Sequence, residues 1–256
     1  MVKDSLLTFL TFLLTWTLLQ WLLLKGPDSF RLIAELLWVI AFYGVAGIYL
    51  PQKVRKKYAF KYGLGHQRPF HVGIGLILLF ALLGFGIFGS GAFLEIVKAK
   101  ISISGYIKYI LIFVPMSFAI SLHLFHIIPN TILSKTRSKR LGTVILLIVS
   151  GLASGLCFAG DTLLGDIAVI TIMIIFGVLF MGVFILTGSF LITWIGYFLV
   201  MYFNTLAEGR YFDYEWYVLI LGFLFSLSML LLGSRNTMKQ IYNNGLHSEN
   251  HSAGAA

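Results

Sequence analysis

The chain has few charged residues: Asp, Glu, Lys and Arg make up 11% of its 256 residues, whereas 59% are hydrophobic. A soluble globular domain carries about 25% charged residues, so this composition excludes an ordinary soluble protein. Several apolar stretches reach the roughly 20 residues that a helix needs to cross a bilayer. These stretches are continuous and do not alternate with polar residues, which argues against a membrane barrel. The sequence therefore predicts an all-α, polytopic membrane protein.

Paired cysteines and common catalytic or cofactor motifs are also missing. Cys157 is the only cysteine, so no disulfide can form within the chain. The patterns G-x-x-x-x-G-K-[ST], H-E-x-x-H and C-x-x-C do not occur. We therefore predict no cofactor, with zinc at a pair of histidines as the alternative considered below.

The apolar pattern divides the chain into eight predicted spans. They lie at 5–24, 31–50, 70–94, 105–128, 141–160, 167–186, 188–206 and 214–233. The sixth and seventh meet at Thr187-Gly188, which predicts either a tight helical hairpin or one broken helix. Together the spans form a single transmembrane domain over residues 1–240. The polar residues 241–256 that follow are predicted to be a disordered tail.

The net charge of +9 arises mainly in two loops, Gln52–Arg68 and Ser134–Arg140. Loops rich in Lys and Arg face the cytoplasm. With eight spans, both termini are then cytoplasmic, and we predict a multi-pass protein of the cytoplasmic (plasma) membrane. The same topology rule, with attraction to anionic lipid, accounts for the charge. The predicted partners are therefore membrane lipids and not nucleic acid.

The stretch "FAISLHLFHIIPNTIL", from Phe118 to Leu133, carries two histidines at membrane depth. On an α-helix, His123 and His126 share one face and could reach the same zinc ion, with Asn130 on that stripe. Zinc needs a further ligand, and no other residue has a telling spacing. The alternative is that both imidazoles bond to carbonyls or hydroxyls of neighbouring helices. In that case Pro129 ends or kinks the helix at the cytoplasmic side.

Two other polar features have structural interpretations. Ser154-Gly155 resembles rhomboid protease sequences, but no histidine follows in a later span to activate the serine. Close helix packing by small residues is the favoured interpretation. Arg31 and Glu35, spaced i and i+4, predict an interfacial salt bridge, and Lys108 is expected to extend its amine outward.

The layout from Tyr58 to Leu206 resembles the CAAX protease and bacteriocin-processing (CPBP, or Abi) family, which includes prenyl-protein proteases. The resemblance is carried by "KYGLGHQRPFHVGIGLILLFALLGFGIF", "IVSGLASGLCFAG" and "IMIIFGVLFMGVFILTGSFLITWIGYF". It implies an eight-span helical bundle with both termini in the cytoplasm.

The chemistry of that family uses E-E-x-x-x-R in span four, a histidine ending span five, and H-x-x-x-N/D in span seven. An ungapped placement puts these groups at Phe118, Ala119, His123, Phe158, Tyr197 and Met201. None of these residues matches the catalytic type, so the resemblance implies a non-catalytic member. Such a member is expected to bind another membrane or envelope protein as partner, regulator or subunit. The expected groove is lined by Phe118, Phe158 and Tyr197, with His123, His126 and Asn130 nearby.

Two alternative functions remain open from the sequence. One is a metal-dependent intramembrane hydrolase that uses His123 and His126. The other is a small transporter or lipid-binding protein whose site is the Thr187-Gly188 break. A helix that starts there would offer free backbone N–H groups to an anion.

Overall fold

The apolar stretches fold into helices in the computed structural model, which describes residues 1–25, 27, 30–64, 67–89, 91–99, 101–162, 167–207 and 216–230. Within these ranges no strand forms, and the only extended pairing is an isolated bridge between Gly63 and Ser189. Helices satisfy their own backbone hydrogen bonds, which a lipid environment requires. The all-α prediction is therefore confirmed. The predicted tail 241–256 lies outside the described residues.

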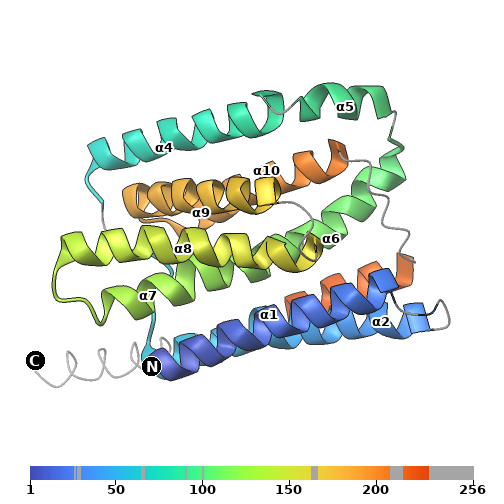
Figure 1. Cartoon of the computed structure of the whole chain (residues 1–256), viewed down its shortest axis with the longest axis horizontal. Helices are drawn as coiled ribbons and strands as arrows, with labels where there is room; N and C mark the ends of the chain where they lie inside the picture. Colours follow the sequence, from blue (N-terminus) through green and yellow to red (C-terminus); the bar gives the residue numbers. More distant parts are fainter. Residues whose placement is uncertain are drawn as a thin grey trace, which may run out of the picture.

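The helices follow one another along the chain and lie roughly side by side (Figure 1). The first segments are α1 (Val2–Lys25), then α2 (Arg31–Leu37), the π-helix η2 (Trp38–Tyr49) and α3 (Leu50–Tyr58). Next come α4 (Pro69–Gly84), the π-helix η3 (Phe85–Gly89), α5 (Ala92–Ala99), α6 (Ile103–Leu122), the π-helix η4 (His123–Ile127) and α7 (Ile128–Leu133). The last are α8 (Lys139–Thr162), α9 (Ile167–Thr187), α10 (Phe190–Ala207) and a helix over Trp216–Leu230.

Six of the described helical segments are long and apolar enough to cross a membrane. Two shorter apolar helices, Phe190–Asn204 and Trp216–Leu230, coincide with the seventh and eighth predicted spans. The chain is thus a multi-pass membrane protein by the length and composition of its helices.

The third predicted span, 70–94, is longer than the continuous helix in the structure. Its helix stops at Gly89, and Gly91 turns the chain with a φ of +74° before α5 begins. Glycine adopts this conformation without the steric cost that a side chain would add. Helix α5 is a separate amphipathic helix, in which Ile96 is buried while Lys98 pairs with Glu95 at 2.8 Å.

The prediction that span four ends near Pro129 is wrong, because the helix continues through Pro129 to Leu133. The π-helical turn η4 immediately precedes the proline. There the Ile128 amide donates to the His123 carbonyl, five residues back. This shift of hydrogen-bond register lets the chain accommodate the missing N–H of the proline.

A tight turn joins α9 to α10, which lie side by side as a hairpin (Figure 1). Gly188 has a φ of +65°, and its amide donates to the Phe184 carbonyl at 2.8 Å. Its own carbonyl accepts from the Leu64 amide at 3.1 Å. A β carbon at Gly63 would lie 2.5 Å from that carbonyl oxygen. Glycine at both positions therefore lets the loop before α4 contact this turn.

Helices α8 and α9 form the most extensive helix pair among the described elements. Gly151 and Gly155, spaced G-x-x-x-G on α8, face Ile174 of α9. On the opposing helix, a β carbon at Gly177 would lie 2.5 Å from that of Ser154. This close approach is the packing that small residues allow in membranes, and it confirms the packing interpretation of the Ser154-Gly155 region.

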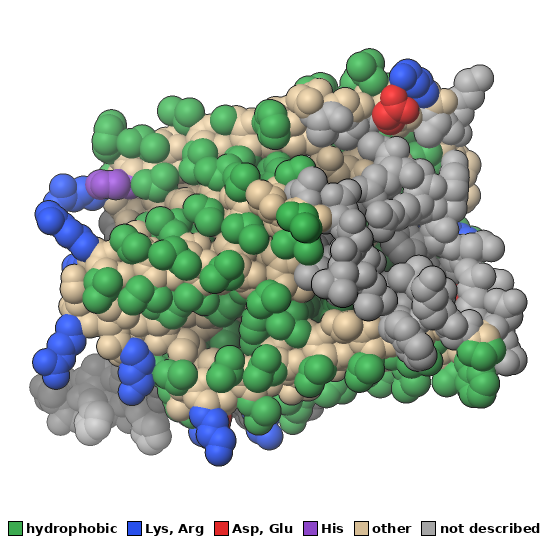
Figure 2. All heavy atoms as spheres, viewed as in Figure 1, with side chains coloured by type: hydrophobic (Ala, Val, Ile, Leu, Met, Phe, Trp, Pro, Cys, Tyr) green, Lys and Arg blue, Asp and Glu red, His purple; other side chains and the backbone are tan. Residues whose placement is uncertain are grey.

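The outer surface of the helices is apolar (Figure 2). The exposed large side chains are Phe70, Ile74, Ile77 and Phe80 on α4, and Phe85 and Phe88 on η3, which continues it. Most of the visible Lys and Arg side chains gather toward the end where α4 begins and α7 ends, at the left of the view. We call this end, which carries the loops 52–68 and 134–140, the basic end.

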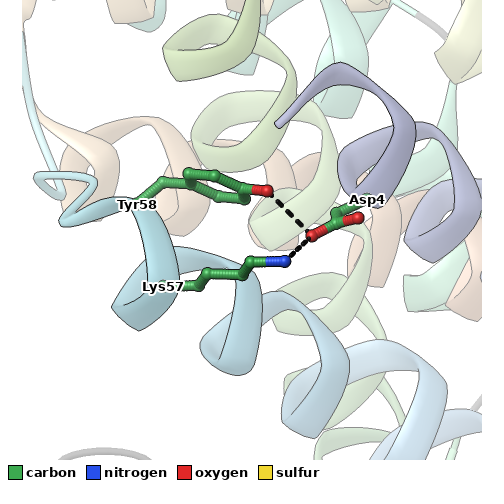
Figure 3. Close-up of polar contacts among 3 residues, drawn as sticks. All are labelled: Asp4, Lys57 and Tyr58. Atoms are coloured by element: carbon green, nitrogen blue, oxygen red, sulfur yellow. Dashed lines mark hydrogen bonds and ion pairs between the residues drawn. The ribbon is translucent and has the colours of Figure 1, made fainter.

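A polar cluster of Asp4, Lys57 and Tyr58 connects α1 to α3 at the basic end (Figure 3). One carboxylate oxygen of Asp4 accepts from Lys57 Nζ at 2.5 Å and from the Tyr58 hydroxyl at 2.8 Å. Nearby, the Thr131 hydroxyl donates to Ser5 Oγ at 2.8 Å. The first turn of α1 therefore contacts both α3 and α7.

Replacing Asp4 by asparagine should lower the apparent melting temperature by no more than about 2 °C, because exposed ion pairs contribute little. The difference should shrink further at high ionic strength, which screens the pair. A thermal shift series in detergent at two salt concentrations measures both effects. A large, salt-independent loss would instead identify this cluster as a main support of the bundle.

Candidate functional site

An open groove of about 730 Å³ lies at the basic end, where the loop before α4 meets the α9–α10 turn. It is lined by Tyr62, Gln67, Val72, Phe118, Thr187, Gly188, Ser189, Phe190, Leu191 and Leu230. The lining is mostly apolar, and its polar groups lie in the loop and in the turn. This combination of an apolar body with few polar groups is typical of ligand sites.

Aromatic rings form one wall of the groove. The Phe190 ring lies between those of Tyr62 and Phe118, with centroids 5.6 and 5.8 Å away. Trp194 supports Phe118 edge to face at 5.2 Å, and its Nε1 donates to Ser117 Oγ at 3.1 Å. Because that hydrogen bond joins α10 to α6, the wall is held in place from behind.

Tyr62 is the most constrained residue of this wall. Its ring stacks on His126, with centroids 4.6 Å apart and an interplanar angle of 21°. The Arg55 guanidinium lies 4.6 Å from the centroid of the same ring, a cation–π distance. The Tyr62 hydroxyl accepts from the Gln52 side chain, which in turn accepts from Arg55 Nε at 2.8 Å. Arg55 is thereby held beside the mouth of the groove.

His126 is buried behind Tyr62, and Asn130 connects it to the loop. The Asn130 side-chain amide donates to the His126 carbonyl at 2.7 Å and to the Lys61 carbonyl at 3.3 Å. The same nitrogen lies 3.4 Å from His126 Nδ1. These contacts fix the loop that carries Tyr62 against the η4 turn.

His123 occupies a different environment. Its Nε2 lies 3.2 Å from the Ala46 carbonyl of η2, within hydrogen-bond distance. Its ring packs at 4.3 Å from that of Phe12 and at 5.9 Å from that of Phe9, both on α1. The side chain is fully buried and joins three helical segments, α1, η2 and η4.

The two histidines have no neighbour in common among these contacts. They lie in a π-helical turn, whose hydrogen bonds run from residue i to i+5, so three positions along the chain no longer mark one face of an α-helix. Nowhere in the described part of the chain do three or more His, Cys, Asp or Glu residues cluster. The geometry thus follows the alternative interpretation, in which each histidine contacts carbonyls and rings of neighbouring segments.

Four of the positions that the CPBP resemblance assigns to catalytic groups, at Ala119, His123, Tyr197 and Met201, are buried, whereas Phe118 lines the groove. Ala119 is fully buried, and a β carbon at Gly47 would lie 2.6 Å from that of Ala119. The Tyr197 ring packs edge to face on Phe125 and Phe180, and it does not line the groove. Met201 is also buried. The side chain of Phe158 lies outside the described residues.

Comparison with known proteins adds no family: no protein-family model, no curated protein and no solved structure matches the chain. The CPBP resemblance therefore stays a prediction from the sequence. The site is accordingly interpreted from its own geometry.

The sequence located part of the groove. It indicated Phe118 and the Thr187-Gly188 break, both of which line it, but not Tyr62 or Leu230. These two come from segments that no pattern in the sequence pairs with the turn.

The sequence also singled out the charged residues Arg31, Glu35 and Lys108, and the structure describes the side chains of the last two. Glu35 is buried, and the Arg31 side chain lies outside the described residues. The Lys108 amine lies 5.4 Å from the centroid of the Trp216 ring. Lys108 thus contacts the last described helix.

Proposed function

We propose that the protein is a non-catalytic, multi-pass membrane protein that binds a lipid acyl chain in the groove between Tyr62, Phe118 and the α9–α10 turn. The observation that carries this proposal is the open, mostly apolar groove beside the basic end. An acyl chain in the bilayer is already surrounded by hydrocarbon, so binding here depends on van der Waals contacts between its CH2 groups and this wall.

The size of the groove favours an acyl chain over a partner helix. A helix with side chains is about 10–12 Å wide and rises 5.4 Å per turn, so each turn occupies roughly 500 Å³. The groove, at about 730 Å³, therefore holds less than two turns of helix. It lies within the range of roughly 300–1,000 Å³ that is usual for small-molecule sites.

The lining residues support a binding role over a hydrolytic one. No acid and no histidine occurs among the ten residues that line the groove. The Thr187 hydroxyl donates to the Val183 carbonyl at 2.8 Å, and Ser189 Oγ accepts from the Ile192 amide at 3.3 Å. A serine or threonine without a neighbouring base is a weak nucleophile.

Substituting tryptophan for Leu191 tests the proposal. Leu191 lines the groove and is 56% exposed, so the indole can fill the space without disturbing the core. The acyl chain would then lose van der Waals contacts with the wall, so we expect this variant to retain clearly less phospholipid than the unmodified protein. The measurement is the molar ratio of phospholipid to protein after purification in mild detergent, by mass spectrometry.

Leu141→Trp is the matched control, because Leu141 is also 56% exposed but lies on α8 away from the groove. It should retain the lipid of the unmodified protein. Equal lipid in both variants would contradict the proposal. So would a stoichiometric protein that co-purifies in place of lipid and is lost from Leu191→Trp alone.

A further inference from the structure

We infer that the groove selects a phospholipid with an anionic headgroup, with the headgroup beside Arg55 and the first turn of α10 and the acyl chain directed toward Phe118. This inference rests on the proposed function and names the class of lipid that the same groove takes.

Positive charge predominates at the basic end beside the groove. The segments 52–68 and 134–140 carry Lys53, Arg55, Lys56, Lys57, Lys61, Arg68, Lys135, Arg137, Lys139 and Arg140, and neither segment contains Asp or Glu, although Lys57 pairs with Asp4 of α1. Tyr62 and Gln67, which line the groove, belong to the first of these loops. Each basic side chain near a membrane surface attracts anionic lipid.

Arg55 is the basic residue that the structure fixes closest to the lining. Its guanidinium lies 4.6 Å from the Tyr62 ring centroid, and its Nε donates to Gln52 at 2.8 Å. These contacts hold the positive charge of Arg55 next to Tyr62, a residue that lines the groove. Tyr62 is held in turn by its stack on His126. The charge is therefore preorganised and does not have to be recruited from a flexible side chain.

The start of α10 adds donors of the same kind. Phe190 and Leu191 are its first two residues, and both line the groove. The helix dipole places partial positive charge at this end, where Ser189 already caps the Ile192 amide through its Oγ. The turn at Gly188 directs this end of an 18-residue helix toward the groove. An anionic group beside Arg55 would thus also meet this helix terminus.

The groove has a polarity gradient that matches an amphipathic lipid. Its polar lining groups, on Tyr62, Gln67 and Ser189, lie in the loop and the turn at the basic end. Phe118 lies eight residues before His126 on the α6–η4 helix, which corresponds to roughly 12 Å along the axis. A lipid with its phosphate at the basic end would place its first CH2 groups against Phe190 and Phe118.

Native mass spectrometry of the full chain in detergent tests the selection, with palmitoyl-oleoyl phosphatidylglycerol and phosphatidylcholine as probes. The acyl chains are identical, so only the headgroup differs. We expect phosphatidylglycerol to bind more tightly. Arg55→Gln should weaken its binding about fivefold, as expected for one basic residue near an anionic headgroup, and weaken phosphatidylcholine less, because that headgroup carries no net charge.

Two further variants separate charge from folding. Arg55→Lys keeps the charge and should retain most of the preference. Lys53→Gln removes the same charge from an exposed position two residues away, on a different face of α3, and should change binding less than twofold.

Equal affinity of the unmodified protein for both lipids would overturn the headgroup inference while leaving chain binding intact. An equal effect of Arg55→Gln and Lys53→Gln would also overturn it. Failure of both lipids to bind would contradict the proposed function itself.

Discussion

Replacing Gly177 by leucine should destabilise the protein by about 3 kcal/mol, the upper part of the range for overpacking a tight interface. A β carbon at this position would already lie 2.5 Å from that of Ser154 and 3.0 Å from the Ser150 carbonyl oxygen. The second contact is with backbone, so it cannot be relieved by rotating a side chain. Helices α8 and α9 would have to separate along their most closely packed stretch. Unfolding by a denaturing detergent, followed by tryptophan fluorescence, measures the loss.

Gly73→Leu provides the control for this experiment. Gly73 lies on α4, and no atom would lie within 4 Å of its added β carbon. The new side chain is the same and is also placed in an apolar helix, so the cost of changing glycine to leucine is matched. We expect the stability of this variant to equal or slightly exceed that of the original protein, because glycine is a poor helix former. Similar losses in both variants would show that the α8–α9 contact is not specially tight.

Replacing His123 by alanine should cost about 3 kcal/mol of stability, the size usual for removing a large buried ring. The ring fills the space between α1 and η2, packs on Phe12 at 4.3 Å and lies beside the Ala46 carbonyl. Its removal leaves a cavity and deprives a buried carbonyl of its partner. The same unfolding measurement applies, with added zinc and with a chelator, and the loss should be the same in both.

His123→Phe distinguishes packing from the hydrogen bond. It keeps a ring on Phe12 and removes only the donor, so it should cost about 1 kcal/mol. His71→Ala, at an exposed position on α4, should be neutral within about 0.5 kcal/mol. If zinc stabilises the original protein and not His123→Ala, the role of His123 as a structural anchor is wrong.

The class of fold could be predicted because lipid imposes a simple rule on sequence. Continuous apolar runs of sufficient length become helices: six of the described segments are long enough to cross a membrane, and two shorter apolar helices coincide with the seventh and eighth predicted spans. Small residues were informative at the Thr187-Gly188 turn and at Ser154-Gly155 on α8. These features depend on local sequence alone, and so they are visible in it.

The π-helical segments could not be predicted. They cover Trp38–Tyr49, Phe85–Gly89 and His123–Ile127, and their composition is that of any apolar helix. A proline follows both η2 and η4 closely, at Pro51 and Pro129, but a proline alone does not distinguish a shifted hydrogen-bond register from a kink or a helix end. The assumption of regular helical spacing therefore misplaced the two histidines relative to each other. The groove was only partly foreseen, since Tyr62 and Leu230 reach it through tertiary contacts.

The hydrogen bond between α1 and α7 also limits when this part of the protein can assemble. The hydroxyls of Ser5 and Thr131 are hydrogen-bonded across 126 positions of the chain. At a synthesis rate of about 5–20 residues per second, the residues between Ser5 and Thr131 take roughly 6–25 s to synthesise. During this interval Asp4 and Ser5 have only water, headgroups or the newly made end of α3 as partners. Helix α1 can pack on η2 and α3 as soon as these are made, whereas its hydrogen bond to α7 forms only after about half of the chain has been synthesised.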